Sequence, residues 1–269
     1  MKITSIGVQK GGVGKTTLAF NLACVLAESE KVLAIDIDPQ CNLSNNFGID
    51  VSQKEAYSSR DIFEETETNP DYLVVKQPIS ALPNLDVIPS NIHMFETDLT
   101  VINKAGRERI LLNYIEDNEA FFKQYDQIII DTNPSMSVLN QNGFLASDSI
   151  IMVAEADDNS LIGIELFMHL WGEIAKKLRK KNNIRGLIIN KGDLRASLTQ
   201  EMWDYCMNDD DLHPILVPQL IRVKEVYKKA NKAKLPVTLY GTAKDKASAT
   251  EAALEIRTAV SILKERGVF

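Results

Sequence analysis

Short apolar runs alternate with longer segments of helical pattern along the whole chain. The runs are continuously rich in Val, Ile and Leu, which is typical of strands buried on both faces of a parallel sheet. The segments between them carry apolar residues at helical spacing. Predicted strands cover Ile3–Val8, Val32–Ile37, Leu85–Ile88, Gln127–Asp131, Ser149–Glu155, Ile184–Asn190 and Ile215–Val217. Predicted helices cover Thr16–Glu28, Leu161–Lys181, Ser197–Met207, Val223–Lys232 and Ala247–Lys264.

This alternation predicts an α/β fold. We expect a mostly parallel, doubly wound central sheet flanked by helices, within a single domain over residues 1–269. Residues 50–80 are polar, acidic and irregular except for a short apolar patch at Ile62–Phe63. We interpret them as a surface excursion, because no linker rich in Pro, Gly or Ser marks a domain boundary there.

The composition narrows the class of protein. Hydrophobic residues make up 45% of the chain and charged residues 25%, which excludes disordered, collagen-like and low-complexity classes. We find no signal peptide, and no apolar run approaches the ~18 residues of a membrane span. The three cysteines, Cys24, Cys41 and Cys206, are widely spaced. This spacing excludes a disulfide framework and a CxxC metal site, and it fits a reducing cytoplasm.

The net charge of −7 is unevenly distributed. Residues 171–234 hold 14 Lys and Arg against 8 Asp and Glu, or +6, and the remainder holds 16 against 29, or −13. Lys224, Lys228 and Lys232 are spaced to share one face of a predicted helix. The flanking cations are Arg222, Lys229 and Lys234, and a second cluster ending another predicted helix comprises Lys176, Lys177, Arg179, Lys180 and Lys181.

Each basic cluster has two interpretations. Cations at a helix C-terminus complement the helix dipole, and lysines on an exposed face are often only solvated. Alternatively, the clusters bind phosphates of duplex DNA without reading its sequence, through contacts that weaken steeply with salt. Because the whole chain is acidic, we expect DNA binding only if two chains bring their basic patches to one surface.

The strongest sequence signal is the segment KGGVGKTT at residues 10–17, directly after a predicted strand and at the start of a predicted helix. This context favours a phosphate-binding loop, in which glycines let backbone N–H groups surround phosphate oxygens and the helix N-terminus adds positive charge. We expect Lys15 to reach the β- and γ-phosphates and Thr16 to bind Mg²⁺. The remaining interpretation is a glycine-rich turn without nucleotide. The expected nucleotide-binding residues of the loop are Lys10, Gly11, Gly12, Val13, Gly14, Lys15, Thr16 and Thr17.

The loop departs from the G-x-x-x-x-G-K-[ST] consensus at its first position. Gln9 stands where the consensus has glycine, and Lys10 adds a second cation beside it. A second cation is costly there unless additional negative charge is present. Lys10 is otherwise a solvent-facing lysine beside the loop.

Three aspartates complete the expected site. Asp131 ends an apolar strand in the manner of a Walker B segment, where it is expected to support Mg²⁺, directly or through water. Its alternative role is to cap a helix that starts near Pro134. Asp36 and Asp38 lie on one side of another strand end, before Pro39. One of them would support the Mg²⁺ shell while the other orients an attacking water, or Asp38 only caps a turn.

These motifs carry a family resemblance. KGGVGKTT, DIDPQ at 36–40, IIIDTNPS at 128–135 and NLDVIPSN at 84–91, together with the late VPQ-x-x-R segment, resemble the ParA/Soj partition ATPases of the MinD-like deviant Walker A group. The similarity runs over nearly the whole chain. The chain resembles the short members of this group, which lack an N-terminal helix-turn-helix.

The resemblance implies a role for each matching residue. Lys10 matches the signature lysine that contacts the partner's nucleotide in an ATP-bound dimer, and Asp38 matches the carboxylate that positions the hydrolytic water. Asp36 and Asp131 match the Mg²⁺ support. Residues implied in recognition of the adenine base are Asn190, Val217, Pro218 and Gln219. Arg195 lies where the family places an arginine that contacts DNA.

Two positions depart from the family pattern. Asn133 replaces the first proline of the family's D-x-P-P-S, which is expected to loosen or re-aim the segment after Asp131. Gln219 stands where the family often has arginine, and Arg222 or Lys224 is expected to substitute.

The first functional hypothesis is therefore a cytoplasmic, nucleoid-associated DNA-segregation ATPase. The resemblance implies ATP and Mg²⁺ as cofactors, an ATP-bound homodimer on nonspecific double-stranded DNA, and a centromere-binding ParB-like partner that stimulates hydrolysis. The expected DNA-binding residues are Arg195, Arg222, Lys224, Lys228 and Lys232.

Three alternatives come from the same wider group. A MinD-like positioning ATPase needs a C-terminal amphipathic membrane helix, for which Ile262, Leu263, Val268 and Phe269 are a thin basis, so no stable membrane association is expected. A metallocluster carrier needs paired cysteines, and a tyrosine-kinase-type member would have a C-terminal tyrosine cluster. Neither pattern is found.

Overall fold

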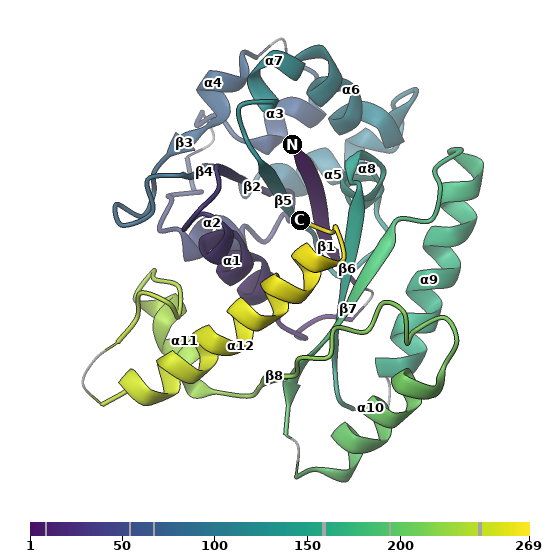
Figure 1. Cartoon of the computed structure of the whole chain (residues 1–269). Helices are drawn as coiled ribbons and strands as arrows, with labels where there is room; N and C mark the ends of the chain where they lie inside the picture. The colour runs from purple at the N-terminus through teal and green to yellow at the C-terminus, as the bar shows by residue number, and fades with distance from the viewer. Residues whose placement is uncertain (9, 54, 67, 158–159, 194, 242–243) are drawn as a thin grey trace.

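The computed structural model describes residues 1–269 except 9, 54, 67, 158–159, 194 and 242–243. Gln9, where the loop departs from the consensus, therefore lies outside the described residues. Eight strands of the described chain form one sheet in the order β3-β4-β2-β5-β1-β6-β7-β8, flanked by helices (Figure 1). Neighbouring strands are parallel except β3, which is antiparallel to β4. The predicted α/β class is confirmed.

The elements follow the predicted alternation. The strands are β1 (Lys2–Gly7), β2 (Val32–Asp36), β3 (Val75–Lys76), β4 (Leu85–Ile88), β5 (Gln127–Asp131), β6 (Ser149–Glu155), β7 (Ile184–Gly192) and β8 (Ile221–Arg222). The helices are α1 (Lys15–Leu26), α2 (Asn42–Asn46), α3 (Ser59–Phe63), α4 (Pro70–Leu73), α5 (Met94–Val101), the 3₁₀ turn η1 (Arg107–Arg109), α6 (Ile110–Asp117), α7 (Glu119–Phe122), α8 (Val138–Ala146), α9 (Ser160–Lys177), α10 (Ser197–Asn208), α11 (Glu225–Lys232) and α12 (Lys246–Glu265).

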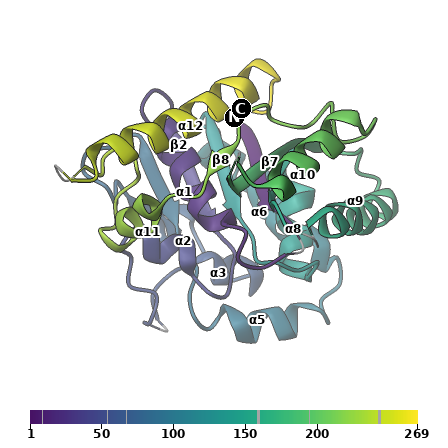
Figure 2. The same cartoon turned by 90° about the horizontal axis from the view of Figure 1, so that it is seen from below.

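The sheet is buried on both faces, as its apolar strands require. In β5, Ile129 packs into the cluster that includes α1 and α12, while Ile128 and Ile130 pack into the opposite cluster with α6 and α8. This alternation follows from the two-residue period of a strand. Figure 2 shows α12 on one side of the sheet and α5 on the other. The carboxyl ends of the parallel strands therefore form the edge that remains available to a ligand.

The last predicted strand is wrong. Ile215–Val217 forms no strand, and only Leu216 makes an isolated parallel bridge, to Leu187. Pro214 and Pro218 bracket this run, and proline cannot donate a ladder hydrogen bond. The edge strand is instead β8, a few residues later.

The basic helix also begins later than predicted. α11 starts at Glu225, because Lys224 retains an extended backbone with φ −143° and ψ 133°. Lys224 therefore does not share a helix face with Lys228 and Lys232, contrary to the prediction. The helix expected at Leu161–Lys181 is α9, which ends at Lys177, so the cations after Lys177 follow the helix rather than end it.

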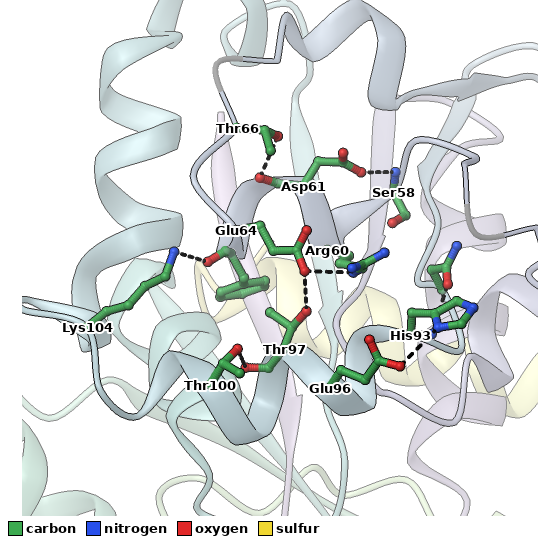
Figure 3. Close-up of polar contacts among 12 residues, drawn as sticks. Ser58, Arg60, Asp61, Glu64, Thr66, His93, Glu96, Thr97, Thr100 and Lys104 are labelled. Carbon is green, nitrogen blue, oxygen red and sulfur yellow. Dashed lines mark hydrogen bonds and ion pairs between the residues drawn. The ribbon is translucent and has the colours of Figure 1, made fainter.

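Residues 50–80 contribute to the core, which corrects the interpretation as a surface excursion. At the start of α3, the backbone N–H of Ser58 donates to the Asp61 carboxylate at 2.9 Å (Figure 3). Its Ile62 and Phe63, and Leu73 of α4, are buried in the cluster beneath β2 and β5. These contacts tie the segment to the sheet, and they agree with the absence of a domain boundary.

The end of the chain packs against the molecule. Leu263 of α12 and the terminal Val268 and Phe269 are buried in the core cluster on the α1 face of the sheet. Three of the four apolar residues considered for a membrane-surface helix, Leu263, Val268 and Phe269, therefore pack in the core. In the described part of the chain, no helix combines the length and the apolar character that crossing a membrane requires.

Candidate nucleotide-binding site

The predicted phosphate loop lies between β1 and α1, at the carboxyl edge of the sheet. Gly12 and Gly14 adopt φ angles of 79° and 89°, a left-handed conformation that glycine accepts without strain. α1 begins at Lys15, directly after Gly14. A Cβ at position 14 would collide with the Asn190 side chain, so glycine is required there for space as well. The loop geometry matches the sequence prediction.

Lys15 lies within this loop and is buried. Its Nζ donates to the Lys10 carbonyl oxygen at 3.3 Å. Burial lowers the pKa of Lys15, and the Asp131 and Asp38 carboxyls oppose this shift. The ammonium therefore lies near two carboxyls in a poorly solvated site, where charges are only weakly screened.

Asp131 is a fully buried carboxylate at the same edge of the sheet. It pairs in register with Ile6 of β1 and Asp36 of β2, and it is fully buried. Neither side-chain oxygen has a hydrogen-bond partner among the described residues. Burial raises the pKa of Asp131 well above its ordinary value, the Asp36 carboxyl raises it further, and Thr16 and Lys15 oppose the shift. An unpaired buried carboxylate is costly without a cation, so a Mg²⁺ ion fits beside it and Thr16.

Asp36, by contrast, is occupied by the protein. Its carboxylate accepts hydrogen bonds from the Ser44 N–H at 2.9 Å, the Ser44 hydroxyl at 2.7 Å and the Asp38 N–H at 3.0 Å. Burial raises the pKa of Asp36 to about 7, against the effect of the Ser44 hydrogen bonds. The geometry makes Asp36 the anchor of the turn that carries Asp38, and leaves it little capacity to contact Mg²⁺.

Asp38 faces the phosphate side of the loop. It lines a cavity of about 390 Å³ together with Lys15, Thr16 and Thr132. Its Oδ1 accepts a hydrogen bond from the Gln40 N–H at 2.8 Å, which is the turn-capping role considered from the sequence. Burial raises the pKa of Asp38, and the Lys15 ammonium opposes this shift. The cap uses one oxygen, and the carboxylate still lies at the cavity where a water could be oriented.

Lys10 lies at the rim of the loop. Its ammonium forms an ion pair with Asp157, from the segment between β6 and α9, and its side chain is 31% exposed. The same chain thus supplies the negative charge that a second cation at this position requires.

The expected base-binding residues divide between two places. Asn190 lines a cavity of about 380 Å³ beside Gly12 and Gly14, whose other walls include Ile221 and Tyr227. Its Nδ2 donates to the Val13 carbonyl oxygen at 2.7 Å. The structure does not bring the other expected residues there: Val217 is buried in the core, and Pro218 and Gln219 line a separate cavity of about 530 Å³.

Asn133 stiffens the segment after Asp131. The Asn140 Nδ2 donates to the Asn133 carbonyl oxygen at 2.8 Å and to its Oδ1 at 2.9 Å, and the Ser135 hydroxyl also bonds to that Oδ1. These side-chain hydrogen bonds restrain the segment, and the expectation that Asn133 loosens or re-aims it stays a prediction.

Several of the expected DNA-binding cations are already paired. Arg222 and Lys224 form ion pairs with Glu251 and Glu255 of α12. Arg195 is 90% exposed and makes two hydrogen bonds to the Asp193 carboxylate, at 2.9 and 3.1 Å.

Lys228 and Lys232, in contrast, are exposed on α11, and within the described chain we find no acidic partner for either. In the same cluster, Lys229 pairs with Asp245 and Lys234 donates to the Asn45 carbonyl oxygen, so Lys228 and Lys232 are the lysines of α11 without an acidic partner in the described chain.

Two neighbours of the loop were missed by sequence reasoning. Asn231 of α11 donates from Nδ2 to the Thr17 hydroxyl at 3.2 Å and lines both cavities beside the loop. Lys191, next to Asn190, donates from Nζ to the Gly12 carbonyl oxygen at 2.5 Å. A cation directly after a strand end was a usable signal for Lys191, whereas nothing local marks Asn231.

Comparisons with known proteins agree with this geometry. The family model AAA_31, described as an AAA domain, matches residues 1–184. The sporulation initiation inhibitor protein Soj of Bacillus subtilis is 30% identical over 229 residues, which cover 83% of this chain and 87% of Soj. The chromosome partitioning protein ParA of Caulobacter vibrioides is 30% identical over 84% of this chain and 83% of its own length. A match to an uncharacterized Mycobacterium tuberculosis protein, 31% identical over 75% of this chain, spans 61% of that protein.

Solved structures share the fold. A plasmid partition protein from Borrelia burgdorferi B31, bound to AMPPNP, superposes with a TM-score of 0.73 and 26% identity, over 95% of this chain and 98% of that one. A Cyanothece McdA variant in complex with ATP superposes with a TM-score of 0.83 over 98% of this chain and 96% of that one. At 21% identity, the second likeness concerns the fold alone.

Proposed function

Because the chain belongs to the ParA/Soj family of P-loop ATPases, we propose that it is a Mg²⁺-ATP-dependent DNA-segregation ATPase. ATP binding joins two chains, the dimer binds nonspecific double-stranded DNA, and ATP hydrolysis separates the dimer and releases the DNA. The observation that carries the proposal is the convergence of Lys15, Asp38, Asp131 and the rim lysine Lys10 on one sheet edge.

The residues at this edge suit hydrolysis of ATP to ADP and phosphate. Lys15 and the loop N–H groups hold the β- and γ-phosphates, and Thr16 with Asp131 holds Mg²⁺. Mg²⁺, when bound, neutralises charge that develops on the transferred phosphoryl group. Asp38 orients a water whose oxygen forms the new bond to the γ-phosphorus, while the bond to the β–γ bridging oxygen breaks. Lys10 of the partner subunit adds positive charge as that bond breaks.

The DNA contacts of the proposed dimer fall mainly on α11. Lys228 and Lys232 are exposed and lack acidic partners in the described chain, and Arg195 is exposed although Asp193 binds it. Two or three phosphate contacts per chain bind duplex DNA weakly, and a dimer doubles them on one surface. ATP-dependent pairing would in this way control DNA affinity.

The partner that stimulates hydrolysis is proposed to be a centromere-binding ParB-like protein, and the site of action the cytoplasm, on the nucleoid. The name of one relative supports the segregation role: the Caulobacter protein is a chromosome partitioning protein. The membrane-associated alternative has less support, because three of its four apolar residues are core residues.

The test is binding to a nonspecific duplex with ATP or ADP, at about 50 and 200 mM salt. Tight, salt-sensitive binding with ATP alone supports the proposal. Equally weak binding in both nucleotide states contradicts DNA as the ligand, and liposome binding would then test the membrane-associated alternative.

A further inference from the structure

Two adjacent side chains at the end of β7 hold the phosphate loop by its backbone. Asn190 Nδ2 donates to the Val13 carbonyl oxygen at 2.7 Å, and Lys191 Nζ donates to the Gly12 carbonyl oxygen at 2.5 Å. We refer to Asn190 and Lys191 as the β7 clamp. The clamp joins a segment near the N-terminus to a strand that lies about 180 residues further along the chain.

A local irregularity lets both residues face the loop. Successive side chains of a regular strand point to opposite faces. Here the pairing of β7 with β8 shifts register between Asn190 and Gly192, and Lys191 adopts a φ of 55°. This bulge at the strand end re-aims the Lys191 side chain. The left-handed backbone conformation is strained for lysine, and it persists only where surrounding contacts hold it.

The contacts that hold Lys191 are an ion pair and a hydrogen bond. Besides its bond to Gly12, its Nζ lies 3.0 Å from Glu155 Oε2, at the end of the neighbouring strand β6. Glu155 and Lys191 also line the cavity on the base side of the loop. Lys191 is therefore fixed between the sheet and the loop.

The clamp determines which way two peptide groups point. The C=O and N–H of one planar trans peptide point in opposite directions. Since the carbonyls of Gly12 and Val13 are bound on the β7 side, the N–H groups of Val13 and Gly14 point away from β7. Loops that cradle phosphate use successive inward N–H groups of this kind.

We propose that Asn190 and Lys191 are positioning residues that preform the phosphate cradle. The inference rests on the proposed nucleotide binding and deepens it, because it assigns the recognition of the polyphosphate to the β7 clamp. A preformed cradle loses less conformational entropy when the ligand binds.

The test compares the binding of Mg²⁺-ATP and of Mg²⁺-tripolyphosphate, which has no base, to Lys191→Met by titration calorimetry. Methionine keeps the apolar stem of the side chain but removes the donor. We expect both ligands to bind about tenfold more weakly, with kcat at saturating ATP within about threefold of the wild type, since the clamp acts on ground state and transition state alike. Asn190→Ala is expected to behave in the same way.

Two further variants serve as controls. Lys123→Met removes an exposed ion pair with Glu119, at 2.8 Å, far from the loop, and should bind both ligands like the wild type. Lys191→Arg retains a donor and should recover most of the affinity. Thermal unfolding without ligand shows whether Lys191→Met and Asn190→Ala are folded. If one of them is not, the other is compared with Lys191→Arg and the wild type.

Two outcomes overturn the clamp. Unchanged affinity of Lys191→Met and Asn190→Ala for both ligands shows that the cradle forms without them. Weaker binding of ATP with unchanged binding of tripolyphosphate shows that these residues contact the base instead. Failure of the wild-type chain to bind Mg²⁺-ATP is a distinct result, which overturns the proposed function and the clamp with it.

Discussion

Lys10, the rim lysine of the phosphate loop, forms an ion pair with Asp157 of the same chain. Asp157 belongs to the segment between β6 and α9, and its side chain is 36% exposed. In the proposed dimer, Lys10 must instead reach the partner's nucleotide. If the proposed dimer forms, we expect the intramolecular pair to compete with it and to favour the single chain when nucleotide is absent.

Removal of this competition should make dimerisation easier. For Asp157→Asn, we expect half-maximal dimerisation at an ATP concentration roughly two- to fivefold lower than for the wild type, because a partly exposed ion pair contributes roughly 0.2–1 kcal/mol. Sedimentation velocity over an ATP series measures the shift. Glu119→Gln, which breaks the exposed Lys123 pair, is the matched control. A midpoint unchanged from the wild type would contradict the competition, as would a dimer that Lys10→Ala still forms.

Asp131 has opposite effects on stability and on metal binding. Its two side-chain oxygens are buried and lack hydrogen-bond partners in the described structure, so the carboxylate destabilises the nucleotide-free protein. Asp131→Asn should raise the free energy of unfolding without ligand by about 1 kcal/mol or more, and should abolish the tightening of ATP binding by Mg²⁺. Chemical denaturation and calorimetry with and without EDTA measure the two effects. A variant that is less stable and still responds to Mg²⁺ would exclude Asp131 as the metal-binding carboxylate.

The carboxylates at the sheet edge should also give the nucleotide-free protein an unusual pH dependence. Burial raises the pKa of Asp36 to about 7, well above its ordinary value near 4, so between these values the folded state binds more protons than the unfolded state. Stability should therefore fall as the pH rises through this window and level off above it. Urea denaturation between about pH 5 and pH 8 measures the slope.

The control for this dependence is Asp36→Asn, which removes the titrating group while keeping the side-chain size. The slope should become shallower in this variant, because Asp36 no longer contributes, although Asp38 and Asp131 still do. If the stability of the wild type instead rises over the same pH window, the result contradicts a raised pKa for the Asp36 carboxyl.

The extent to which the sequence predicts this site depends on the range of each interaction. The phosphate loop and the strand-end Asp131 were predictable, because a strand–loop–helix pattern and an apolar run are local signals. Asn231 was not, because its contact with Thr17 joins residues brought together only by the docking of α11. The strand predicted at Ile215–Val217 fails for a similar reason. An apolar run indicates burial, but Pro214 and Pro218 limit this run to one parallel bridge with Leu187.

The sequence also does not show which cations of the basic cluster have acidic partners. Counting cations placed Arg222 and Lys224 with Lys228, but the first two lie against the acidic residues of α12. Glu255, which accepts the Arg222 N–H at 3.0 Å, lies thirty-three residues away in sequence. Only the packing of α12 beside β8 shows which lysines have acidic partners and which do not.

DNA affinity should depend on the unpaired lysines and much less on the paired ones. Each phosphate contact contributes to the salt dependence of binding, with a slope near −0.9 per contact for duplex DNA, about one unit of slope for each lysine lost. We expect Lys228→Gln to weaken ATP-dependent duplex binding severalfold at about 100 mM salt and to reduce the slope by about one unit, or two for the dimer.

The matched comparison is Lys224→Gln, which removes the same charge from the same cluster. Its ammonium lies 2.7 Å from Glu251 Oε2, so it is already neutralised and its loss should leave the salt slope near the wild-type value. Fluorescence anisotropy of a labelled duplex over a salt series, with ATP throughout, measures both variants. Equal losses of slope would mean that the ion pairs of Lys224 open on DNA, and that the DNA-binding surface includes the segment before α11 as well as the helix itself.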